Sequence, residues 1–207
     1  MSMPSSRRSL KSPETQLIGD LFGLKRDLES VVAFCQRLLA AFDATPVDRD
    51  LLDALSTACV VRYCRCFEGG VRAKLARDNV QNFAPRFLVL HDYFFTLRQK
   101  HLVHAVNEFE ANEVAVVVSK APSPRTVLDV AIVGGRVAGL DRETAANFKL
   151  LAAKLLDAVA TDLEAQEQRL LDSLKSRPIA KLYELPEAPP FAPSWTRAAT
   201  KRRRSDS

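Results

Sequence analysis

Two long stretches of the chain repeat apolar residues at helical steps of three or four positions, and this period constrains the fold more than any other feature. Residues at these steps lie along one side of an α-helix, so the sequence predicts helices over residues 14–42 and, after a cap at Asp141, up to Pro178. Each stripe needs a surface that covers it, in this chain or in another. The stripes consist of Leu17, Leu21, Leu24, Leu28, Val31, Cys35, Leu38 and Phe42, and of Phe148, Leu151, Leu155, Val159, Leu163, Leu170 and Leu174.

Two further helices are expected between these stretches. One should begin at Thr45-Pro46, because Thr caps helices and Pro suits the first turn, and should stop at Gly69-Gly70. Few residues separate it from the first helix, so the two should pack as an antiparallel hairpin. Residues 71–84 carry both helix and loop signals, and the next helix is expected over about residues 85–109, which contain all three histidines of the chain.

Between about residues 113 and 140 the pattern changes to short β-branched runs. These predict an antiparallel sheet of two or three strands, too small to be stable alone, so it should lie against the helices. The fold class is therefore mainly α, a bundle of four or five helices with a small β-hairpin insertion. The expected strands are residues 114–118, 126–133 and 136–140, with turns at residues 121–124 and at Gly134-Gly135.

Basic residues concentrate at the two ends of the chain. The net charge is +5, of which residues 1–13 carry +3 and residues 177–207 carry +4, so residues 14–176 carry −2. We therefore expect one nearly neutral helical domain over residues 14–176, a disordered basic segment before it and a disordered, Pro-rich basic segment after it. The basic run at residues 201–204 predicts only non-specific, salt-sensitive attraction to nucleic acid, or a solvated end.

Other features exclude whole classes of protein. No apolar run approaches the roughly 18 residues that cross a bilayer, and residues 1–13 lack the apolar middle of a secretory signal, so a cytoplasmic, non-membrane protein is expected. The cysteines are expected to be reduced, buried thiols, because no CxxC pair or zinc-ligand spacing is present. The sequence thus predicts no metal and no cofactor. These cysteines are Cys35, Cys59, Cys64 and Cys66.

One short motif carries candidate chemistry. Arg98 is followed by five residues and then His104, near the end of a predicted core helix. This spacing resembles the motif of the HEPN superfamily, small helical domains with an Arg, four to six residues and a His; members commonly have Asn, Asp or His where this chain has Gln99. Many HEPN proteins are metal-independent ribonucleases of toxin–antitoxin or antiviral systems, and others bind without cutting. The resemblance implies an endoribonuclease or RNA-binding protein, of a toxin or phage-defence system, with RNA and an antitoxin as possible partners.

The residue types fit that chemistry. RNA supplies its own nucleophile, the 2′-OH, so cleavage needs a proton-transfer group and a cation on the phosphate. His104 is the candidate acid–base and Arg98 the phosphate clamp, while Lys100, His101 and Asn107 are candidate substrate contacts. Six residues of ideal helix rise roughly 9 Å and leave two side chains about 120° apart. A working site therefore requires a helix break after Arg98 or a second subunit, and a homodimer is expected.

The alternative is a non-catalytic helical interaction or regulatory protein. In that interpretation Arg98 and His104 cap helix carbonyls or lie in the core, and the apolar stripes bind a partner protein. A metal pair of His101 and His104 lacks a third ligand. The two hypotheses differ in structure, because the ribonuclease needs Arg98 and His104 accessible in a groove or at a symmetric interface.

Overall fold

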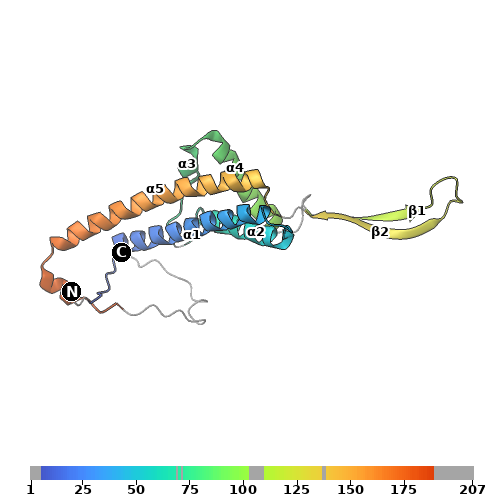
Figure 1. Cartoon of the computed structure of the whole chain (residues 1–207). Helices are drawn as coiled ribbons and strands as arrows, with labels where there is room; N and C mark the ends of the chain where they lie inside the picture. Colours follow the sequence, from blue (N-terminus) through green and yellow to red (C-terminus); the bar gives the residue numbers. More distant parts are fainter. Residues whose placement is uncertain (1–5, 69, 71, 103–109, 137–138, 189–207) are drawn as a thin grey trace.

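The computed structural model describes residues 6–188 except 69, 71, 103–109 and 137–138. Within these residues the fold is mainly helical with one two-stranded antiparallel sheet, which confirms the predicted class (Figure 1). The elements are α1 (Pro13–Phe42), α2 (Arg49–Arg65), α3 (Arg77–Gln81), α4 (Pro85–Leu97), a π-helical turn η1 (Arg98–Leu102), β1 (Glu110–Val118), β2 (Val127–Arg136), α5 (Arg142–Lys175) and α6 (Ile179–Tyr183).

The two long helices, α1 and α5, pack side by side and run in opposite directions (Figure 1). Asp43, the C-cap of α1, is bound by Arg142 in the first turn of α5 with a nitrogen–oxygen distance of 2.6 Å. Ser12 and Asp141 cap the two helices by accepting backbone N–H groups. Each predicted stripe is confirmed as core in part. The buried residues are the central ones of the α1 stripe, Leu24, Leu28, Val31, Cys35 and Leu38, and the first five of the α5 stripe, Phe148, Leu151, Leu155, Val159 and Leu163.

The helices α2 and α4 pack onto this pair and complete the core. α2 is antiparallel to α1, as predicted: Cys59 meets Cys35 at 3.6 Å, while Arg62, later in α2, meets Asp27, earlier in α1, at 2.9 Å. Aromatic rings fill the junction with α4 and α5: the Phe94 and Phe148 rings stack with centroids 3.8 Å apart, and Tyr63 meets both edge-on. Such ring pairs add to the hydrophobic stabilisation of the core.

Several helix boundaries differ from the prediction, and α2 ends at Arg65, before the expected stop at Gly69-Gly70. α2 begins at Arg49, because the Asp48 carboxylate, two residues after Pro46, accepts the N–H of Leu51 at 2.9 Å and caps the helix. A five-residue helix, α3, lies within the ambiguous segment. The helix expected over residues 85–109 is α-helical only to Leu97, where the π-helical turn takes over.

The β-hairpin is larger than expected, and only one of its two predicted turns is present. The chain turns over residues 119–126, which confirms the turn expected at residues 121–124. The turn expected at Gly134-Gly135 is wrong, because both residues lie inside β2, opposite Asn112 and Ala111. A glycine pair is also compatible with an extended strand, so the turn signal was ambiguous. The hairpin does not lie against the helices either; it extends from one end of the helix pair (Figure 1).

The segments before α1 and after α5 meet each other. Ser9 donates its N–H to the carbonyl of Pro186 at 2.7 Å, and Ala188 donates to Arg7 at 2.9 Å. The structure adds α6 within the region that the sequence assigned to the Pro-rich end. None of the described helices combines the length and the apolar character that crossing a bilayer requires.

Candidate functional site

The predicted motif lies where α4 changes to the π-helical turn. Arg98 is the first residue of that turn and its guanidinium pairs with the carboxylate of Glu68, just beyond α2; the two side chains are 30% and 34% exposed. Lys100 is exposed in the same turn, which also contains His101. The predictions for His104 and Asn107 lie outside the described residues. The structure thus places Arg98, Lys100 and His101 in one turn, with Arg98 held in an ion pair.

The thiol of Cys64 lies close enough to Arg98 for the charge of the guanidinium to act on it. Burial raises the pKa of the Cys64 thiol to about 12, and the positive charge of Arg98 offsets this only in part. The thiol is therefore protonated at neutral pH and is a poor nucleophile. Its sulfur lies 3.6 Å from the carbonyl of Phe94, near the end of α4.

His91 is a core residue. Its side chain is 5% exposed, its Nδ1 lies 2.8 Å from the hydroxyl of Tyr63, and it packs against the ring of Phe67. Burial lowers the pKa of His91, so the ring is neutral at pH 7. Within the described residues, no group of three or more His, Cys, Asp or Glu side chains is arranged to hold a metal ion.

A buried charge cluster ties α1 to the end of α2. The Asp27 side chain is 3% exposed and pairs with Arg62 at 2.9 Å, Arg65 at 3.2 Å and Arg72 at 2.9 Å. Burial by itself would raise the pKa of Asp27, but hydrogen bonds from Arg72 and Arg62 and the charge of Arg65 outweigh it, and the pKa lies below its usual value. Sequence reasoning missed this cluster, because it joins residues far apart in the chain.

The hairpin exposes apolar side chains in a regular pattern. Side chains alternate between the two faces of a strand, and residues paired across the ladder share a face. Val114 pairs with Ile132, Val116 with Val130, and Val118 with Val127 after an irregularity in the register beyond Val117. All six are β-branched and lie on one side of the hairpin, which we call the aliphatic face: Val114, Val116, Val118, Val127, Val130 and Ile132.

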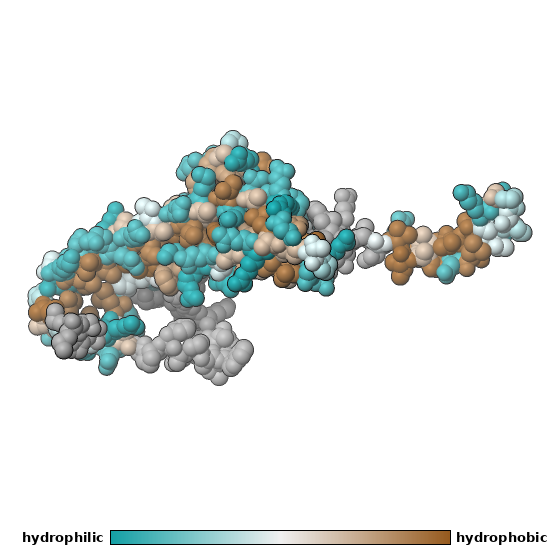
Figure 2. Space-filling model, viewed as in Figure 1, coloured by the Kyte–Doolittle hydropathy of each residue, from teal (hydrophilic) through white to brown (hydrophobic). Residues whose placement is uncertain are grey.

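The opposite face has a different composition. It carries the carboxylates of Glu113 and Asp129 together with four apolar residues, Ala115, Ala131, Val117 and Val133. The residues of the aliphatic face are 59% to 76% exposed. Figure 2 shows hydrophobic residues along the length of the hairpin. A sheet with one apolar and one more polar face is typical of a sheet that packs on one side.

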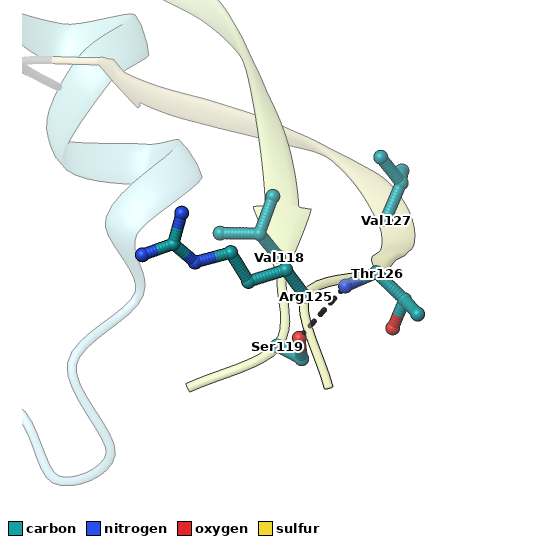
Figure 3. A pocket seen from close by; sticks show the side chains of 5 residues that line it. All are labelled: Val118, Ser119, Arg125, Thr126 and Val127. Carbon is teal, nitrogen blue, oxygen red and sulfur yellow. Dashed lines mark hydrogen bonds between the residues drawn. The ribbon is translucent and has the colours of Figure 1, made fainter. Parts of the chain in front are cut away.

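The aliphatic face ends in a hollow near the turn. This hollow has a volume of about 390 Å³ and is lined by Val118, Ser119, Arg125, Thr126 and Val127. Figure 3 shows the Arg125 side chain extending past Val118, and Ser119 closing the turn by accepting the N–H of Thr126 at 3.0 Å. The hollow is of a size that admits one or a few apolar side chains.

Comparison with protein-family models, with curated proteins and with solved structures found no match. The HEPN resemblance therefore stays a prediction from the motif. Among the described residues, the aliphatic face combines six exposed apolar side chains on one side of the hairpin. The alternating β-branched pattern is visible in the sequence, which predicts that the sheet packs on the helices, whereas the structure leaves this face exposed.

Proposed function

We propose that this protein is a non-catalytic interaction protein, and that its β-hairpin binds a protein partner through the aliphatic face. The observation that carries the proposal is the set of six β-branched side chains, 59% to 76% exposed, on a single face. Contiguous apolar patches are rare on monomeric proteins and commonly mark binding sites.

The hairpin is dispensable for the core, which supports a binding role. The buried core formed by the described residues contains no residue of β1 or β2. A two-stranded hairpin is marginally stable in water, and this one gains no packing from the helices. Covering the aliphatic face would therefore stabilise the hairpin itself, and binding would be coupled to its ordering.

The test places a photo-crosslinking amino acid at position 116, on the aliphatic face, or at position 115, on the opposite face. In cells that produce the protein naturally, we expect a discrete protein adduct from position 116 and little or none from position 115. Equal adducts from both positions, or none from either, would contradict the proposal.

A second proposal concerns the motif: cleavage or binding of RNA by Arg98 and His104, with Lys100, His101 and Asn107 as substrate contacts. One observation favours it, since α-helical geometry ends at Leu97, where the motif requires a helix break. π-helical turns are also frequent at functional sites. The ion pair with Glu68 weighs against it, because it occupies the guanidinium that would clamp phosphate.

This second proposal is tested with RNA and pure protein, with and without chelator. The comparison is between the wild type, Arg98→Ala and His104→Ala, and Glu68→Gln serves to release Arg98. Cleavage that only the two motif variants lose, and that chelator leaves unchanged, would support it. Equal cleavage by all variants would reject the assignment.

A further inference from the structure

This inference rests on the proposed interaction function and names the partner. We infer that the occupant of the aliphatic face is a second copy of this chain, so that two hairpins pack face to face across a twofold axis. Four observations support a second copy: the composition of the face, the charge of the hairpin, the area available and the position of the hairpin on the molecule.

The face is complementary to itself. All six of its side chains are aliphatic and β-branched, and none carries a charge. In a twofold dimer each copy contributes the same patch, so a uniform apolar patch meets a patch of its own kind. β-Branched side chains interdigitate well when two sheets stack at about 10 Å. A partner with charged groups would find none to pair with among these six side chains; Arg125 lies at the end of the face, beside the turn.

Charge does not oppose the association. Residues 110–136 contain Glu110, Glu113 and Asp129 against Lys120, Arg125 and Arg136, so the hairpin is neutral. Glu113 and Asp129 belong to the face that stays in water when the aliphatic faces meet. Two copies therefore approach without net repulsion and without burying a carboxylate from the opposite face.

The available area suits a reversible dimer. The six side chains average about two-thirds exposed, and an aliphatic side chain removes roughly 60–120 Å² of apolar surface from water when fully buried. Two copies would then bury on the order of 500–900 Å² of apolar surface. Stable complexes typically bury roughly 1,200 Å² or more in total, a figure that also includes polar side chains at the rim and backbone atoms. We therefore expect a dissociation constant on the order of micromolar.

The position of the hairpin leaves its face accessible. It extends from one end of the α1–α5 pair, so a second hairpin can reach it without overlap of the two helical bodies (Figure 1). In an antiparallel arrangement the turn of one hairpin lies over the base of the other. The hollow lined by Val118 and Val127 then receives Ile132 of the second copy, which is the most exposed residue of the face at 76%.

The test measures the molecular mass of the full chain by sedimentation equilibrium over about 1–100 µM, the range that brackets a micromolar constant. The decisive variant is the double substitution Val116→Thr with Val130→Thr, which keeps β-branched strand formers and adds hydroxyls to the aliphatic face. Its matched control is Ala115→Thr with Ala131→Thr, a directly opposed pair on the other face. Circular dichroism checks that each variant retains its helical body.

We expect the wild type and the control to dimerise with similar constants and the decisive variant to dimerise at least tenfold more weakly. A wild type that stays monomeric at the highest concentration overturns the inference, as does equal weakening by both double variants. A monomer that still forms a position-116 adduct with a different protein overturns the second copy and leaves the interaction function standing. Binding of monomers to phospholipid vesicles through Val116 and Val130 would overturn both.

Discussion

The substitution Asp27→Asn should destabilise the fold far more than its exposed counterpart, Asp92→Asn. Asp27 is 3% exposed and is contacted by three arginines, whereas Asp92 is 52% exposed and pairs with Arg77 alone at 2.7 Å. Both substitutions keep side-chain shape and remove one negative charge. The two sites differ in burial and in the number of arginine partners, and both differences predict a larger effect at Asp27.

The magnitude follows from what remains after the charge is removed. Breaking a buried ion pair costs about 3–5 kcal/mol, because a charge is left without compensation. Arg62 and Arg65 are 43% and 56% exposed and can turn towards water, so only Arg72, at 22%, stays largely confined. We expect Asp27→Asn to lower the free energy of unfolding by about 2–3 kcal/mol, and Asp92→Asn to cost a small fraction of that.

The pH dependence provides a second check with a definite sign. The folded-state pKa of Asp27 is lowered, since the arginine contacts outweigh the opposing effect of burial. A lowered folded-state pKa contributes stability that is fully present above the unfolded pKa of about 4 and is lost as the pH falls through the folded value. The gap between wild type and Asp27→Asn should therefore be constant near pH 7 and shrink below about pH 4.

Urea unfolding followed by circular dichroism at 222 nm measures both effects, with the slope m compared between variants to confirm that the unfolding transition is the same. Equal losses of stability from Asp27→Asn and Asp92→Asn would refute the reasoning, because neither burial nor the additional arginine partners of Asp27 would then make a difference. A gap that widens on acidification would refute the assigned sign of the pKa shift.

Three further predictions use the same unfolding assay or a simple chemical probe. Gly139 has φ of +80°, and an added Cβ would lie 2.8 Å from Ser56 Oγ, so Gly139→Ala should lower the free energy of unfolding by about 1–2 kcal/mol. At Gly19 in α1 nothing lies within 4 Å of an added Cβ, so Gly19→Ala should raise the free energy of unfolding by about 0.5–1 kcal/mol. The reverse order of stability would contradict both predictions. Tyr63→Phe removes the hydroxyl beside Nδ1 of His91 and should lower the free energy of unfolding by about 1–3 kcal/mol. An unchanged urea midpoint would mean that water replaces the hydroxyl. All four thiols are buried, so a thiol-specific disulfide reagent should label them only as fast as the protein unfolds, and immediate labelling of the native protein would show an exposed thiol.

The helical framework could be predicted because its signals are local. The apolar period of α1 and α5, the Asp141 cap and the breaks around Pro13 and Pro178 all act within a few residues of the chain. The same holds for the existence of β1 and β2, whose β-branched alternation is a property of consecutive residues. These predictions needed no knowledge of what the elements pack against.

Local signals of similar strength competed elsewhere, and tertiary structure decided between them. Thr45 and Asp48 can both cap a helix, and the backbone that leads into α2 selects Asp48. Gly134-Gly135 suits either a turn or a strand, and cross-strand pairing with β1 places the pair within β2. The π-helical turn that begins at Arg98 likewise contacts α2, which is distant in the sequence.

The sequence by itself determined which residues are apolar and with what period, and hence the helices, the hairpin and a β-branched face. Only the tertiary structure decided which apolar surfaces meet inside the molecule. The stripes of α1 and α5 cover each other, Asp27 gathers arginines from distant positions, and the aliphatic face stays open to solvent. The physical reason is that periodicity is set by neighbours along the chain, whereas burial is set by which distant segments can reach the surface in three dimensions.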